Sequence, residues 1–130
     1  MHITRTTVCL QVRDVAAATR FFVDHFAYAA LLAETDYAKL RHAHGHELFF
    51  LRCGARITPE EAVSEQPAAG VVLAFEVEDA AGELARLRDA GVAITEPLKD
   101  EPWGERLFRV EDPNGVVVQL VQWLTPQPAS

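Results

Sequence analysis

The stretch EPWGERLFRVEDPNGVVVQLVQW, residues 101–123, contains two strand-like segments joined by the turn-forming sequence DPNG. The second segment, about 116–123, is mostly apolar, yet Gln119 lies in its middle. A primary amide that is buried without hydrogen-bond partners costs roughly 1–3 kcal/mol. Gln119 therefore either points to water or lines a cavity where another group satisfies it. We expect it in a cavity, where a ligand or water is its partner.

Two segments of the chain repeat one pattern, in which a strand leads into an aspartate and then a helix. TVCLQVRDVAAATRFF begins at Thr7, and VLAFEVEDAAGELARL begins at Val72. The first residues of each segment alternate in character, which predicts a sheet strand with two different faces. Asp14 and Asp79 occupy equivalent positions, where a carboxylate suits a helix N-cap. The two halves of the chain therefore share one plan.

Each helix is followed by three further strand candidates. These are about 28–33, 37–42 and 47–52 in the first half, and about 92–98, 105–111 and 116–123 in the second. We therefore expect an α+β fold of two tandem βαβββ modules, whose mixed β-sheets curl into a cup with the helices outside. We expect a single domain over residues 1–130, with module 1 at about 4–53, a polar linker at about 54–69 and module 2 at about 70–124.

Composition limits the classes of function. The chain has 130 residues, of which 49% are hydrophobic and 24% charged, as in a globular protein. Its net charge of −7 argues against a nucleic-acid partner; we read it as a soluble surface rather than as attraction for a cationic ligand. The sequence shows no membrane-spanning run and no signal-peptide pattern, and it has only two cysteines. We expect a cytoplasmic protein.

The repeated plan, together with the WGER and DPNG elements, resembles the vicinal oxygen chelate superfamily. That superfamily includes glyoxalases, extradiol dioxygenases, and fosfomycin- and bleomycin-resistance proteins. The resemblance covers nearly the whole chain, and its most specific part is the stretch 101–123 quoted above. It implies paired βαβββ modules, a homodimer and a ligand pocket inside the cup.

The resemblance also implies where a metal ion would be held. Metal-dependent members place a His on the first strand, a second ligand at the start of the matching strand, and a Glu after the DPNG-like turn. Those positions are Thr7, Val72 and Gln119 here, and Phe49 matches Gln119 in module 1. Valine cannot coordinate a metal, and a hydroxyl or amide is a poor replacement for imidazole and carboxylate. We therefore expect neither a metal nor another cofactor.

Strand alternation predicts which side chains line the cup. This surface is mostly apolar and partly aromatic, with a few polar groups, which is typical of sites for small molecules. The expected ligand-binding residues are Thr7, Cys9, Phe49, Leu51, Val72, Ala74, Trp103, Leu107, Arg109, Gln119 and Val121, with Val117 on the same face.

Four of the larger side chains have alternative roles. Trp103 would stack on an aromatic ligand, or would only cover the rim of the cup or a dimer contact. Arg109 would anchor a ligand oxygen, or would pair with a nearby acid. Phe49 would stack opposite Trp103, or would fill the core. Trp123 belongs to the pocket, the core or a dimer interface, and we do not count it as a binding residue.

RHAHGHELFF contains His42, His44 and His46, a spacing that allows a metal hypothesis. Gly45 marks a turn that would separate the imidazoles, so a solvated hairpin tip is the preferred interpretation. Cys9 would be a nucleophile only beside a His, and we expect a small buried residue instead.

Catalysis has little support in the sequence. Glu47 and Glu76 are the only obvious general-base candidates, and neither has an evident acid–base partner, so we assign no catalytic residue. The preferred hypothesis is a metal-independent protein that binds an aromatic natural product and gives antibiotic resistance by sequestration. The first alternative is a glyoxalase- or dioxygenase-like enzyme (isomerase, lyase or cyclase) that works without the usual metal or with relocated ligands. The second is a structural or regulatory dimer whose cup is filled by its own side chains.

Overall fold

The computed structural model describes residues 1–126. The chain divides into two units, Met1–Ala69 and Gly70–Ser130, and each contains one four-stranded mixed sheet with one helix. In the described part of the chain, no helix is both long and apolar enough to cross a membrane. The two units are similar α+β modules, as the sequence predicts.

Unit 1 follows the order β1 (Thr7–Val12), α1 (Val15–Phe26), β2 (Tyr28–Ala33), β3 (Tyr37–His42) and β4 (Glu47–Arg52). Its sheet has the strand order β1-β4-β3-β2, with β1 parallel to β4 and the other pairs antiparallel. The carboxylate of Asp14 accepts a hydrogen bond from Ala17 N at 3.0 Å, which confirms the predicted N-cap of α1.

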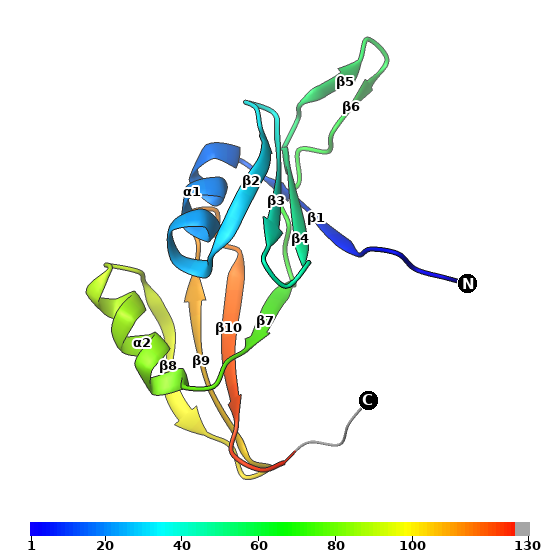
Figure 1. Cartoon of the computed structure of the whole chain (residues 1–130). Coiled ribbons are helices and arrows are strands. Elements are labelled where there is room, and N and C mark those ends of the chain that lie inside the picture. Colours follow the sequence, from blue (N-terminus) through cyan, green and yellow to red (C-terminus); the bar gives the residue numbers. More distant parts are fainter. Residues whose placement is uncertain (127–130) are drawn as a thin grey trace. The chain divides into compact units, whose positions relative to one another are not determined.

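Helix α1 covers one face of this sheet (Figure 1). The side chains beneath it alternate along the strands and are fully buried, as period-two patterning requires. Phe22 of α1 packs against Phe50 of β4, with ring centroids 5.6 Å apart. The core of unit 1 is formed mainly by Leu10, Val12, Phe22, Leu40, Leu48 and Phe50. The opposite face, which carries no helix, is called the open face below.

The segment expected as a linker contains a short hairpin of β5 (Arg56–Thr58) and β6 (Glu61–Ala62). It extends away from the four-stranded sheet of unit 1 (Figure 1). Its base is fixed, because Val63 is buried and exchanges backbone hydrogen bonds with Gly54 and Ala55. The segment therefore contains regular structure and is part of unit 1.

Unit 2 repeats the plan with β7 (Val72–Glu76), α2 (Ala80–Asp89), β8 (Ile94–Asp100), β9 (Glu105–Glu111) and β10 (Val117–Trp123). Its sheet order is β7-β10-β9-β8, with β7 parallel to β10. Asp79 caps α2 by accepting from Gly82 N at 3.0 Å, as predicted. Helix α2 contacts β8, β9 and β10, and the buried side chains on its side of the sheet are Phe108, Val110, Val118 and Leu120.

Candidate functional site

The open face of the unit 2 sheet places predicted site residues side by side. Gln119 of β10 is the register partner of Arg109 on β9 and of Ala74 on β7. Two residues further along β10, Val121 is the register partner of Leu107 on β9. Because side chains alternate between the faces, these residues share the face opposite α2. The predicted grouping of strand residues in module 2 therefore follows directly from the register.

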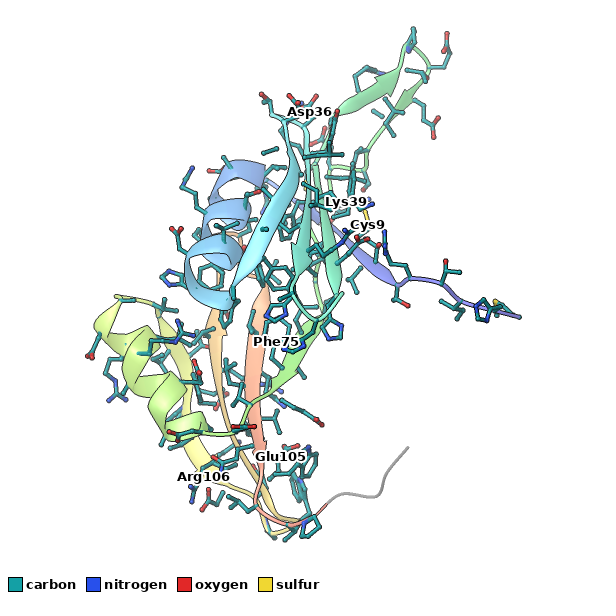
Figure 2. All side chains as sticks on the ribbon, in the orientation of Figure 1. Cys9, Asp36, Lys39, Phe75, Glu105 and Arg106 are labelled. Atoms are coloured by element: carbon teal, nitrogen blue, oxygen red, sulfur yellow. The ribbon has the colours of Figure 1, made fainter. Side chains whose placement is uncertain are left out.

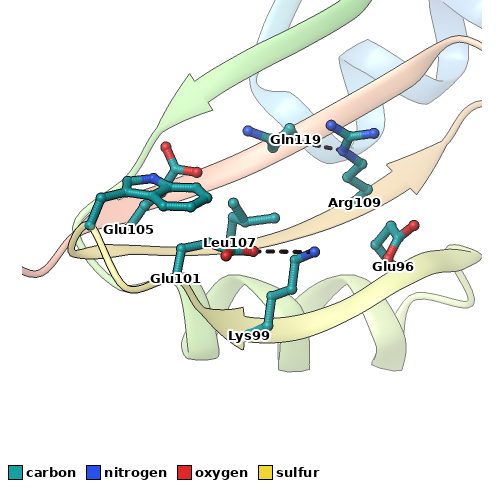
Figure 3. A pocket seen from close by; sticks show the side chains of 8 residues that line it. Glu96, Lys99, Glu101, Glu105, Leu107, Arg109 and Gln119 are labelled. Atoms are coloured by element: carbon teal, nitrogen blue, oxygen red, sulfur yellow. Dashed lines mark hydrogen bonds and ion pairs between the residues drawn. The ribbon is translucent and has the colours of Figure 1, made fainter.

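A small, open pocket of about 290 Å³ lies on this face (Figure 3). Its volume is at the lower end of the range for small-molecule sites. It contains four of the predicted residues, Trp103, Leu107, Arg109 and Gln119, and four that were not predicted, Glu96, Lys99, Glu101 and Glu105.

Gln119 obtains a hydrogen-bond partner from the neighbouring strand, so the expectation that a ligand or water is its partner is wrong for its side-chain oxygen. Its Oε1 atom accepts from Arg109 Nε at 2.8 Å, and both side chains are half-buried (Figure 3). The contact satisfies an amide oxygen in an otherwise apolar strand with a charged donor, which is a strong hydrogen bond. Arg109 therefore faces the cavity, as the first of its two predicted alternatives requires, and its partner is an amide rather than an acid.

Trp103 lies in the short loop between β8 and β9, and it is 61% exposed. Backbone hydrogen bonds close the loop: Gly104 N donates to Glu101 O at 3.0 Å, and Glu101 N donates to Glu105 O at 2.7 Å. Leu124 N donates to Gly104 O at 2.7 Å, which attaches the loop to the end of β10. The indole is thus presented on a tightly held loop at the pocket, where a large flat apolar surface is available to a ligand.

The pocket carries charges of both signs. Lys99 Nζ lies 3.3 Å from Glu101 Oε1, so these two side chains form an ion pair (Figure 3). Glu96 is the register partner of Arg109 across the edge of the sheet. With three carboxylates and two cations, the lining suits a ligand with polar groups around an apolar centre better than a hydrocarbon.

The other predicted residues of module 2 lie on the same face outside the pocket lining. Val72 and Ala74 are exposed on the edge strand β7, Val117 is half-buried, and Val121 is only 4% exposed. Leu107, which does line the pocket, is also buried, at 6% exposed.

Unit 1 presents Thr7, Cys9, Phe49 and Leu51 on its own open face, as alternation predicts. Thr7 Oγ1 donates to Glu47 Oε1 at 2.8 Å. Phe49 stacks on Tyr37, with ring centroids 6.0 Å apart and planes 8° from parallel. Leu51 is half-buried beside Tyr37, its register partner on β3.

Cys9 is exposed, so the expectation of a buried residue is wrong. Its position on the open face, rather than under α1, explains the difference. Partial burial by neighbouring atoms nevertheless raises the pKa of its thiol. A thiol with a raised pKa is less ionised at neutral pH, so Cys9 is a weak candidate for a nucleophile.

The two general-base candidates are engaged in different ways. The Glu47 side chain is fully buried and holds three cations, described below. Glu76 is exposed at the end of β7, and its Oε1 atom accepts from Trp123 Nε1 at 2.9 Å. Neither arrangement resembles an acid–base pair.

The residues at the positions of the superfamily's metal ligands do not fit a metal ion. Thr7 donates its hydroxyl proton to Glu47, and the Gln119 oxygen lies 2.8 Å from a guanidinium nitrogen. Val72 has no donor atom. Among residues 1–126, no three His, Cys, Asp or Glu side chains gather as possible ligands of one ion.

His42, His44 and His46 lie at the turn between β3 and β4, as predicted. The rings of His42 and His44 stack with centroids 5.2 Å apart, and His42 Nδ1 accepts from His44 N at 3.2 Å. Burial, together with the charges of the other two imidazoles, lowers the pKa of His42. His44 and His46 are exposed, which agrees with the preferred interpretation of a solvated hairpin tip.

Charged residues are the part of the site that sequence reasoning missed. Lys39 and Arg41 lie on β3 beside Phe49 and Glu47, their register partners on β4. Pairing the two arms of the HAHGHE hairpin would have placed them there. Glu96 and Lys99 were harder to find, because β8 carries two register irregularities that break its alternation. Glu101 lies in the loop after β8, and Glu105 is the first residue of β9.

Comparisons with known proteins give the family and the fold. The sequence profile of the Glyoxalase/Bleomycin resistance protein/Dioxygenase superfamily matches residues 2–120. A solved glyoxalase/bleomycin resistance protein/dioxygenase from Nocardioides is similar, with a TM-score of 0.78 and 24% identity over 100% of this chain and 90% of that one. TioX from Micromonospora sp. ML1 has a TM-score of 0.70 and 26% identity, over 94% and 100% of the two chains.

A lactoylglutathione lyase from Agrobacterium tumefaciens has a TM-score of 0.74 and 15% identity, over 93% of this chain and 94% of that one. At this identity the likeness shows the fold alone. No curated protein matches the chain.

Proposed function

Because the chain belongs to the Glyoxalase/Bleomycin resistance protein/Dioxygenase superfamily, we propose that it binds an aromatic small molecule without a metal ion. In this proposal the protein acts by sequestering the compound, as an antibiotic-resistance protein does. The observation that carries the proposal is the pocket beside Trp103, where an exposed indole lies near a buried leucine and a fixed arginine.

Each part of the pocket has a role in this proposal. The Trp103 indole stacks on the ligand, which contributes roughly 0.5–1.5 kcal/mol beyond the burial of apolar area. Leu107 forms an apolar floor. Arg109, oriented by its hydrogen bond to Gln119, fixes a ligand oxygen. Binding and orientation need no proton transfer, so the proposal requires no acid–base partner for Glu47 or Glu76.

The first test is binding of a panel of aromatic antibiotics by calorimetry, with wild-type protein and the variant Trp103→Ala. We expect Trp103→Ala to weaken binding about tenfold while the thermal transition stays in place, since the side chain is exposed. Trp123→Phe is the matched control, because Trp123 does not line the pocket. Equal affinities in wild type and Trp103→Ala would contradict the assigned role.

The second test concerns the metal. Untagged protein is exposed to Mn²⁺, Fe²⁺, Ni²⁺ and Zn²⁺, dialysed and measured by elemental analysis. We expect no stoichiometric metal, because Thr7, Val72 and Gln119 supply neither imidazole nor carboxylate. Tightly held metal at one ion per chain would reject the metal-free proposal and favour an enzyme with relocated ligands.

A further inference from the structure

The open face of unit 1 carries a group of charged side chains around Glu47, called the Glu47 cluster here. Glu47 is only 2% exposed, and its carboxylate is surrounded by three cations. Arg41 lies closest, with Nε at 2.7 Å and Nη2 at 2.6 Å from Oε2. Lys39 Nζ lies 3.6 Å from Oε1, and Arg5 Nη1 lies 3.6 Å from Oε2.

The cluster has an excess of positive charge. Three cations share one carboxylate, whereas the chain as a whole has a net charge of −7. The Glu47 side chain is 0% exposed, while those of Lys39, Arg41 and Arg5 are 31%, 37% and 54% exposed. The surface offered to solvent is therefore cationic, and the buried carboxylate holds the cations in position without neutralising all of them.

An aromatic surface lies directly beside these cations. Lys39 is the register partner of Phe49, and Phe49 stacks on Tyr37 from the same face. Lys39 and Cys9 lie on the side of the sheet away from α1 (Figure 2). A fixed positive group next to a stacked aromatic pair is the arrangement that recognises a planar ring with a negatively charged substituent.

We propose that the open face of unit 1 binds the oxyanion of an aromatic ligand, with Lys39, Arg41 and Arg5 contacting a carboxylate, sulfonate or phosphate and Phe49 contacting the ring. Glu47 and Thr7 position the cations and do not contact the ligand. This inference deepens the proposed function and rests on it, because Phe49 belongs to the ligand-binding surface that the sequence predicts. The amide shifts of β1, β3 and β4 test it separately from the pocket beside Trp103, which lies in the other unit.

The experiment uses 1-naphthoate as the probe and 1-naphthalenemethanol as its neutral counterpart, added to the full-length, ¹⁵N-labelled protein. We expect naphthoate to shift the backbone amides of β1, β3 and β4, and to bind several-fold more tightly than the alcohol. Added salt should weaken naphthoate binding and leave the alcohol unchanged, since only the first depends on exposed charges.

The variant Lys39→Gln removes one cation of the cluster. We expect it to raise the dissociation constant of naphthoate about tenfold, as the loss of a charged hydrogen-bond donor does. Arg86→Gln is the matched control, because it removes the same charge from an exposed ion pair on α2. If Lys39→Gln does not fold, Arg5→Gln tests the same cluster. Arg5 precedes β1, so this substitution does not change a strand residue.

Four results would overturn the proposal. The first is equal affinity for the acid and the alcohol. The second is an unchanged dissociation constant in Lys39→Gln and Arg5→Gln. The third is a set of amide shifts confined to residues 96–119, which would place the probe in the pocket beside Trp103. The fourth is binding of inorganic phosphate as tight as that of naphthoate, because the ring would then not be recognised.

Discussion

Thr7 shows how one side chain takes a structural role at a position where related proteins hold a metal. Its hydroxyl donates to Glu47, which also accepts from Arg41. Burial raises the pKa of Glu47, but the hydrogen bonds from Thr7 and Arg41 and the charges of Lys39 and Arg41 outweigh it. The pKa of this carboxyl is therefore held below its usual range.

The variant Thr7→Val tests this arrangement through pH. A carboxyl with a lowered folded-state pKa stabilises the protein above its unfolded value near 4.5, and the stabilisation is lost as the pH falls through the folded-state value. Removing the Thr7 donor should raise the pKa of Glu47 and move acid unfolding to higher pH. Carboxyl NMR titration measures the first effect. Thr6→Val, one residue earlier, is the control, and equal pKa values in all three proteins would contradict the role of Thr7.

Gln119 shows what the sequence can and cannot predict about a site residue. Its place in an apolar strand was enough to predict that the amide lines a cavity and needs a partner, but the expected partner was a ligand or water. The identity of that partner depends on strand register, which pairs it with Arg109. Register comes from packing between strands and is not contained in the alternation of one strand. For the same reason, Glu47 could be singled out from sequence while its three cations were missed.

At the scale of elements, the end of α1 carries a conformational strain that α2 avoids. Ala27, the C-cap of α1, has φ 60 and ψ 30, in the left-handed region. The corresponding turn after α2 uses Gly91, with φ 82. A residue with a Cβ pays about 1–2 kcal/mol for this conformation, and glycine does not.

We therefore expect Ala27→Gly to stabilise the protein by about 0.5–1 kcal/mol, since relief of strain is partly offset by the entropy of glycine in the unfolded chain. Gly91→Ala is the reciprocal control and should destabilise by about 1 kcal/mol. Nothing lies within 4 Å of a Cβ built there, so strain alone would act. Denaturant unfolding measures both, and a destabilised Ala27→Gly would contradict the argument.

The loop that carries Trp103 depends on Gly104. This residue has φ 95, and a Cβ added to it would lie 2.5 Å from Thr125 Oγ1. We expect Gly104→Ala to displace the loop and to weaken binding of an aromatic ligand at least several-fold, with a loss of about 1–2 kcal/mol in unfolding free energy.

Gly45→Ala is the control that separates the loss of stability caused by backbone strain from the loss of ligand affinity caused by displacement of the Trp103 loop. Gly45 has φ 90 in another hairpin, and no atom lies within 4 Å of an added Cβ. The control should lose similar stability and keep full ligand affinity, as measured by calorimetry. If both variants keep full affinity, the position of the loop does not determine binding.

The elements themselves were predictable to different degrees. Strands β2, β3, β4 and β9 begin and end where alternation and turn residues indicate. The buried residues of β3, β4 and β9 lie mainly on one face, whereas β2 buries only Tyr28. Strand β8 begins at Ile94 and ends at Asp100, so both ends lie two residues later in the sequence than expected, since its irregular register obscures the pattern. The β5–β6 hairpin is exposed along both strands and gives no alternation to detect.

At the scale of the whole molecule, the repeat produces two modules whose open faces differ in chemistry. The pocket of unit 2 has more acids than bases, and the Glu47 cluster of unit 1 has more bases than acids. The two modules share one fold but carry surfaces of unlike charge. The superfamily profile matches residues 2–120 as a whole and does not show this difference. In both proposals, the charged side chains that would contact the ligand lie outside the positions used for metal ligands.

Both modules also leave apolar groups on edge strands, and this is the physical basis for proposing a homodimer. Leu31 and Leu32 of the edge strand β2 are 45% and 48% exposed, and Val72 of the edge strand β7 is 42% exposed. Exposed apolar edges favour contacts with another chain. We propose that β2 takes part in the contact.

Light scattering after size exclusion should therefore give twice the 14.4 kDa mass of the chain. Lysine at both Leu31 and Leu32 should shift the mass toward that of one chain, because two charges on an edge strand oppose pairing and burial. Val23→Lys on α1 is the control, since Val23 is also exposed, at 39%, but lies on a helix. A wild-type mass of one chain would reject the dimer. An unchanged dimer in the Leu31→Lys, Leu32→Lys protein would place the contact elsewhere than β2.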